Sequence, residues 1–144
     1  MLMKYRSGVL LALIFAFALP IVTLAQSSPP QAQQSPLFAE IQAKIVRTIG
    51  AAPLTVEIMQ TGSIITVLRI NSNMNEATHS GRDNEASAIA PIVADAVAGK
   101  SEFKNLTTIR VQYVIQSAPG TTSKVVDTVD FRKSPSGTFE FHKT

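Results

Sequence analysis

Hydrophobic residues recur with two different periods along this chain, and the order of these periods limits the folds open to it. A period of three to four residues indicates an amphipathic helix, whereas strict alternation indicates a half-buried strand. Helical spacing follows Ser35 and Pro36, and returns from Asp83 or Asn84 to Ala98. Alternating or β-branched segments lie at residues 54–59, 64–70, 109–116 and 124–133, with a short last one at 138–142. The predicted order is α-β-β-α-β-β, with room for a short final strand.

Turn-forming residues separate the strands of each predicted pair, and strands joined by short turns run antiparallel. The two amphipathic helices need an apolar surface to cover, and one face of a sheet provides it. We therefore expect an α+β fold: a two-layer sandwich with an antiparallel sheet and two helices on one face, forming one domain over residues 37–144. The chain contains no cysteine, so this domain has to fold on its hydrophobic core alone.

Two local features refine this expectation. Pro91 lies inside the second predicted helix, where it removes a hydrogen bond and clashes with the preceding turn. Either the helix kinks at Pro91 or its main part begins near Ala90. The clearest alternation is in residues 109–116, where Val111 and Ile115 share a face, so we expect both to be buried.

The first 25 residues have the three-part composition of a secretory signal peptide. Lys4 and Arg6 precede an unbroken apolar run at residues 9–19, and Thr23-Leu24-Ala25 supplies small residues before a cleavage site. The alternative is a permanent membrane anchor, but a spanning helix needs about 20 apolar residues. We expect cleavage, a secreted or periplasmic protein, no stable membrane anchor afterwards, and a disordered linker at residues 26–36.

Charge argues against nucleic acid as a partner. Of the 13 Lys and Arg residues, Lys4 and Arg6 fall in the signal segment, which leaves 11 against 10 acidic residues. Nucleic-acid binding requires a basic patch or stripe, and the remaining basic residues are scattered.

Residues 71–84 form the longest polar stretch of the domain, and we expect a long loop there. His79, Arg82 and Asp83 are its weak candidates for ligand binding. His79 and Asp83 are four residues apart, a spacing open to metal ligands or an acid–base pair. The simpler interpretation, which we favour, is a solvated loop in which Asp83 opposes the dipole of the second helix.

No motif predicts a cofactor, a metal site or a catalytic residue. The spacing Asn71-x-Asn73-x-Asn75 resembles the start of a calcium loop, but Glu76 and Arg82 occupy the positions that require Gly and Glu. Asp127 shares the parity of the apolar residues on its strand, and the sequence does not explain it.

The sequence therefore favours an exported, non-catalytic binding or accessory domain whose ligand is unknown. Its partner would be an envelope or extracellular macromolecule. Two alternatives remain open: a small hydrolase or metal-dependent enzyme using residues 71–85, and an accessory domain that adds an edge strand to a partner sheet. The oligomeric state stays unknown at this point.

Overall fold

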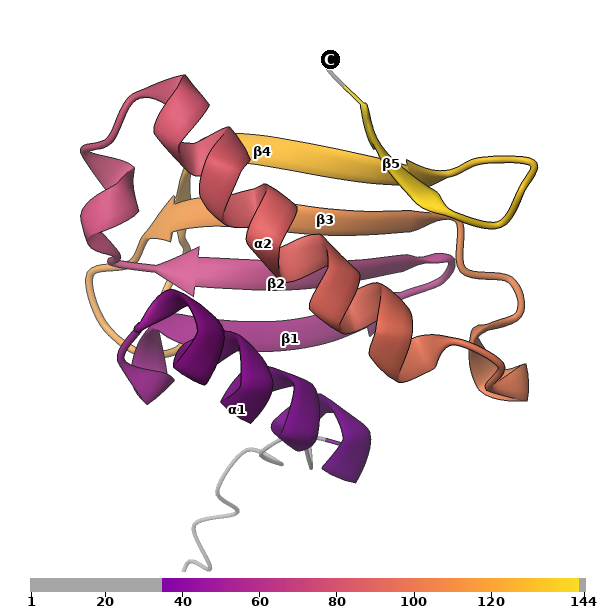
Figure 1. The fold of residues 1–144 in the computed structure, drawn as a ribbon. Coiled ribbons are helices and arrows are strands. Elements are labelled where there is room, and N and C mark those ends of the chain that lie inside the picture. The colour runs from indigo at the N-terminus through magenta and orange to yellow at the C-terminus, as the bar shows by residue number, and fades with distance from the viewer. Residues whose placement is uncertain (1–34, 143–144) are drawn as a thin grey trace, which may run out of the picture. The chain divides into compact units, whose positions relative to one another are not determined.

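The computed structural model describes residues 35–142. The predicted signal peptide, and the linker up to residue 34, lie outside the described residues. The elements are α1 (Pro36–Ile49), β1 (Val56–Thr61), β2 (Ile64–Ile70), α2 (His79–Val97), β3 (Thr108–Ile115), β4 (Lys124–Lys133) and β5 (Phe139–His142). The α+β class is confirmed, and β5 extends the predicted order by one short strand (Figure 1).

The five strands form one sheet in the order β1-β2-β3-β4-β5. The prediction of an antiparallel sheet is wrong at its centre, because β2 and β3 run parallel, from Ile64 opposite Thr108 to Ile70 opposite Val114. The other three pairs are antiparallel. Short connections join β1 to β2 and β3 to β4, so these pairs are antiparallel as expected. The connection from β2 to β3 contains α2 and is long enough to return the chain for a parallel strand.

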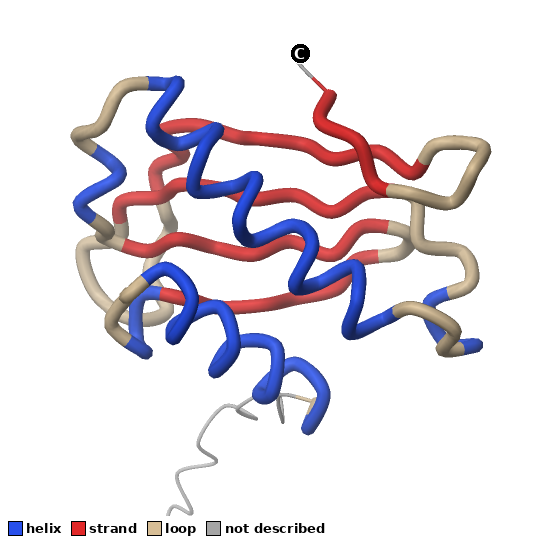
Figure 2. The backbone as a smooth tube through the Cα atoms, viewed as in Figure 1, coloured by secondary structure: helices blue, strands red, loops and turns tan. Residues whose placement is uncertain are grey.

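Both helices lie in front of the sheet in the view of Figure 1, and α2 crosses the strands diagonally (Figure 2). Ile41 and Ile45 of α1 and Ile89 and Val93 of α2 are at most 1% exposed. They join one hydrophobic core with the inward residues of β1 to β4. Within residues 35–142, no helix is both long and apolar enough to cross a membrane.

The predicted loop at residues 71–84 is shorter than expected, because α2 begins at His79. Thr78 is its N-cap, and its hydroxyl accepts a hydrogen bond from the Gly81 N–H. Asp83 therefore lies inside α2 and does not cap it, contrary to our expectation. The residues in the first turns of α2 are exposed or half-buried, and most of them are polar. The helical spacing of buried apolar residues therefore begins only at Ala86.

Helix α2 runs uninterrupted past Pro91 from His79 to Val97. Pro91 and Ser87 are both exposed, so the Ser87 carbonyl that loses its helical partner faces water. This exposure explains why the helix tolerates the proline.

An irregularity between β3 and β4 interrupts the predicted alternation. Tyr113 pairs with Asp127 but Val114 pairs with Val125, so Val126 is an extra residue on β4. Val111, Tyr113 and Val114 are all buried, whereas Ile115 is 46% exposed at the end of the strand. The predicted burial of Ile115 is therefore wrong, and that of Val111 is confirmed.

Candidate functional site

Two of the three sequence-predicted site residues meet on one carboxylate. Asp127 of β4 accepts hydrogen bonds at 2.6 Å on the same oxygen, Oδ2, from Arg82 Nε and from a ring nitrogen of His79, Nδ1. Asp83 stands beside them, with its Oδ1 3.8 Å from His79 Nε2. The start of α2 thus packs on β4 through a polar cluster of His79, Arg82, Asp83 and Asp127.

Besides Asp127, Arg82 contacts several neighbouring groups and helps to hold this region together. Its Nη1 donates to the carbonyl of Ala77 at 2.6 Å and, more weakly, to that of Met74 at 3.3 Å. The carbonyl of Arg82 accepts a hydrogen bond from the Tyr113 hydroxyl at 2.9 Å. Burial, reinforced by the charge of Glu85, raises the pKa of Tyr113 far above its ordinary value, so the hydroxyl stays protonated and keeps donating. Arg82 is therefore better suited to structure than to ligand binding.

The charge state of Asp127 follows from opposing effects. Burial works to raise the pKa of Asp127, but hydrogen bonds from Arg82, His79 and the Thr128 N–H outweigh it. The net pKa is lowered, so Asp127 is ionised at neutral pH.

A histidine beside a carboxylate is the arrangement required for proton transfer. A hollow of about 290 Å³ adjoins it, lined by His79, Asp83, Asp127, Thr128, Val129, Phe141 and His142. Nδ1 of His79 is occupied by Asp127, whereas Nε2 lies 3.8 Å from Asp83 Oδ1, beyond hydrogen-bonding distance. Among the described residues, no group of three His, Asp or Glu side chains is placed to hold a metal ion.

Two asparagines of the predicted loop also make structural contacts. Asn71 donates to the Gln116 carbonyl and accepts from its N–H, both at 2.8 Å, which ties the end of β2 to the end of β3. Asn75 donates to the Val114 carbonyl at 3.0 Å. These contacts hold Asn71 and Asn75 against the ends of β2 and β3.

A buried ion pair that the sequence pattern did not predict lies next to this cluster. Arg69 of β2 is only 2% exposed, and its Nε donates to Glu85 Oε1 at 2.7 Å. Its Nη1 donates to the carbonyl and hydroxyl of Thr55. Arg69 has the same parity as Ile65 and Val67, which both face the helices, and this parity is the signal that could have revealed it.

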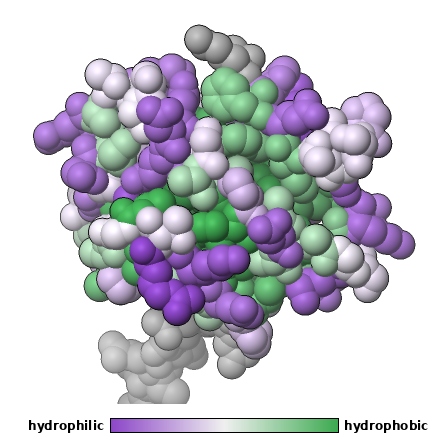
Figure 3. All heavy atoms as spheres, in the orientation of Figure 1, coloured by the Kyte–Doolittle hydropathy of each residue, from purple (hydrophilic) through white to green (hydrophobic). Residues whose placement is uncertain are grey.

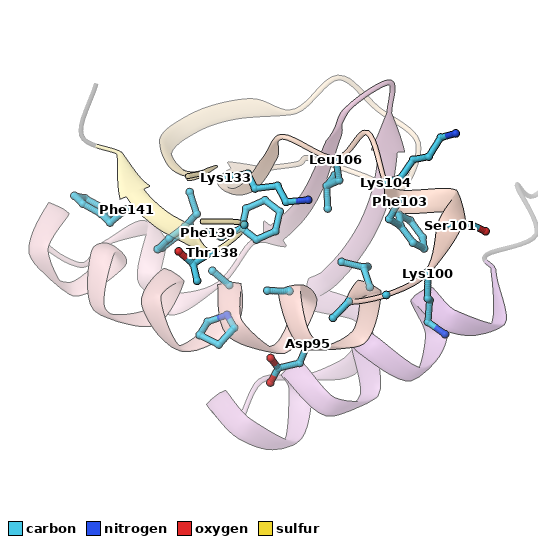
Figure 4. Close-up of a pocket in the computed structure, with 18 of the residues that line it drawn as sticks. Asp95, Lys100, Ser101, Phe103, Lys104, Leu106, Lys133, Thr138, Phe139 and Phe141 are labelled. Atoms are coloured by element: carbon cyan, nitrogen blue, oxygen red, sulfur yellow. The ribbon is translucent and has the colours of Figure 1, made fainter. Parts of the chain in front are cut away.

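A second hollow, larger than the one beside His79, lies elsewhere and is mainly apolar. Its volume is about 790 Å³, and it opens between the C-terminal half of α2, the turn that follows it, and the β4–β5 hairpin (Figure 4). We call it the apolar cleft. Figure 3 shows apolar surface gathered on the helix-bearing face of the molecule. The apolar side chains lining the cleft are those of Ala90, Pro91, Ala94, Val97, Ala98, Phe103, Leu106, Phe131, Phe139 and Phe141.

Local sequence explains why the apolar cleft stays open. The α2 face that looks into it carries small residues, Ala90 and Ala94, which leave space above the sheet. Across the cleft, Phe131 is 5% exposed and Phe141 is 45% exposed, with their ring centroids 5.8 Å apart in an edge-to-face pair. The sequence signal for this cleft is an alanine-rich helix followed by closely spaced phenylalanines near the end of the chain.

The charged side chains that line the apolar cleft are mainly lysines. Lys100, Lys104 and Lys133 line it, against the single acid Asp95. Within residues 35–142, none of these four side chains forms a salt bridge. Figure 4 shows Lys133 above the apolar floor, whereas Lys100 and Lys104, on the segment following α2, extend outward from the cleft in opposite directions.

Comparison of the chain with protein-family models, curated proteins and solved structures gives no match.

Proposed function

We propose that this chain is an exported, non-catalytic binding domain and that the apolar cleft holds its ligand. The observation that carries the proposal is the cleft itself, about 790 Å³ in volume with a floor of alanine and phenylalanine side chains. Ligand pockets are typically concave, mostly apolar and between about 300 and 1,000 Å³. A contiguous exposed apolar surface with polar residues at its rim is typical of ligand-binding grooves and interaction sites.

The side chains in the apolar cleft support binding without turnover. Its polar side chains are three lysines, one aspartate, two serines and a threonine, and no histidine lies among the residues that line it. Its threonine, Thr138, bonds to the serine hydroxyls of the β4–β5 turn and donates to Glu140 Oε1 at 3.3 Å, all in an exposed turn. The alternative enzyme site at residues 71–85 does contain a histidine beside a carboxylate. There, however, His79 has a carboxylate near each of its two ring nitrogens.

The strand edge of β4 is a less suitable docking place. β5 pairs only with residues 130–133, so among the described residues the first part of β4 has a strand on one side only, where it pairs with β3. That part contains the extra residue Val126, and the Thr128 N–H already donates to Asp127 Oδ1 at 2.8 Å. Bulges and blocked N–H groups are devices that discourage strand addition.

Filling the apolar cleft tests the proposal. Ala94→Leu adds a side chain within the cleft, whereas Ala43→Leu makes the same change on the exposed face of α1. The neutral dye Nile red should gain fluorescence with the wild-type chain and with Ala43→Leu, and lose most of that gain with Ala94→Leu. Equal fluorescence from both variants would show that the cleft is not the binding site.

A further inference from the structure

The shape of the apolar cleft selects among apolar ligands. On the helix side it is lined from Ser87 to Val97, a stretch of α2 about 15 Å long. On the opposite side it is lined by β4, β5 and the hairpin between them. An extended aliphatic chain can lie along such a cleft and contact alanines on one side and phenylalanine rings on the other.

Polar groups are scarce on the floor of the apolar cleft, and this argues against a peptide. A peptide carries a donor and an acceptor at every residue, and burying them without partners costs free energy. Floor residues such as Ala94, Phe103 and Phe131 offer no side-chain partner. An acyl chain has no such requirement.

The charges at the rim of the apolar cleft favour a ligand with an anionic head group. Lys100, Lys104 and Lys133 are without a carboxylate partner among the described residues, and they face only one acid, Asp95. Lysine ammonium groups are compact point charges on flexible stems, suited to a single anionic group whose position varies. These lysines are exposed, so an anionic head gains a modest electrostatic attraction there that a neutral head does not.

We infer that the occupant of the apolar cleft is a monomeric long-chain fatty acid, with its chain on the alanine and phenylalanine floor and its carboxylate beside Lys133, while Lys104 and Lys100 add positive charge farther along the rim. This inference rests on the proposed function, because it names the ligand class of the same cleft.

Isothermal titration of the full-length protein with palmitate tests this assignment, with hexadecanol as the neutral ligand of equal chain length. Lys100→Gln, Lys104→Gln and Lys133→Gln combined remove the rim charge but keep polar side chains. Lys44→Gln is the control, on the exposed face of α1. The triple variant should weaken palmitate about tenfold, leave hexadecanol within about twofold, and Lys44→Gln should change neither. Palmitate binding should also weaken as salt is raised.

The contrary results separate the two proposals. If palmitate and hexadecanol bind equally, and the triple variant changes neither, the cleft binds apolar chains but the assignment of an anionic head is overturned. If neither ligand binds the wild type, or if Ala94→Leu binds both as well as wild type does, the apolar cleft itself is not a ligand site. If only vesicles of anionic phospholipid are bound, the ligand is a membrane surface and the inference of a monomeric fatty acid is wrong.

Discussion

The carboxylate of Asp127 and the guanidinium of Arg82 lie 2.6 Å apart and join β4 to the start of α2. Their side chains are only 13% and 12% exposed, so the pair is largely shielded from water. In the sequence, Asp127 has the same parity as the apolar residues of β4, and the sequence alone does not explain why. The contact with Arg82 explains it.

We expect Asp127→Asn to lower the free energy of unfolding by about 3 kcal/mol, because it leaves Arg82 without its charged partner in a mostly buried position. Urea unfolding measures the loss. Asp95→Asn is the control, since Asp95 is exposed on α2 and forms no salt bridge among residues 35–142. Equal, small losses in the two variants would mean that the ion pair does not stabilise the fold.

Acid should destabilise the domain, and Asp127 should contribute to the effect. Its folded pKa is held below the ordinary 3.8, so its stabilising contribution is complete above that value and disappears as the pH falls through the folded pKa. Asp130, whose pKa is lowered by the Arg110 side chain at 2.7 Å, acts in the same direction. The free energy of unfolding should therefore fall with pH below about 4, and less steeply in Asp127→Asn. Parallel curves for the two proteins would contradict the contribution of Asp127.

The buried pair of Arg69 and Glu85 predicts non-additive substitutions. Glu85→Leu alone leaves the Arg69 charge uncompensated in the core, and Arg69→Met alone leaves Glu85 half-buried without its partner. Each should cost about 3 kcal/mol, whereas the double variant should cost clearly less than the sum of the two. A double-mutant cycle in urea gives the coupling energy. Additive losses would show that the two charges act independently.

The irregularity at the end of β3 can be tested by two neighbouring substitutions. Val114 is 1% exposed and Ile115 is 46% exposed. Val114→Ala should therefore cost about 2 kcal/mol, and Ile115→Ala clearly less, although it removes the larger group. If Ile115→Ala proves the more costly change, the alternation of β3 continues to its last residue and the register at Val126 is wrong.

Much of the fold follows from hydrophobic periodicity. The α+β class and the bounds of β4 at Lys124 and Lys133 match the sequence expectation, because these segments have clear turns around them. The start of α2 does not, since Thr78 caps a polar first turn that carries no helical hydrophobic pattern. The parallel pairing of β2 and β3 depends on how α2 packs across the sheet, which no local pattern reveals.

The candidate site was less predictable than the fold. His79 and Arg82 were selected from their polar surroundings, but their common partner, Asp127, is 48 and 45 residues away in the chain. The apolar cleft combines α2 with β4 and β5, and its residues individually have the composition of an ordinary core. Only their arrangement in space shows that a hollow remains between them.

The location of bound ligand tests the central claim most directly. Backbone amide chemical shifts of the full-length, isotope-labelled protein would be followed by NMR during titration with palmitate. We predict that the largest changes fall at residues 90–106 and 131–141, which surround the apolar cleft, and that residues 71–85 change little. Changes concentrated at residues 71–85, or no saturable change at all, would contradict the account.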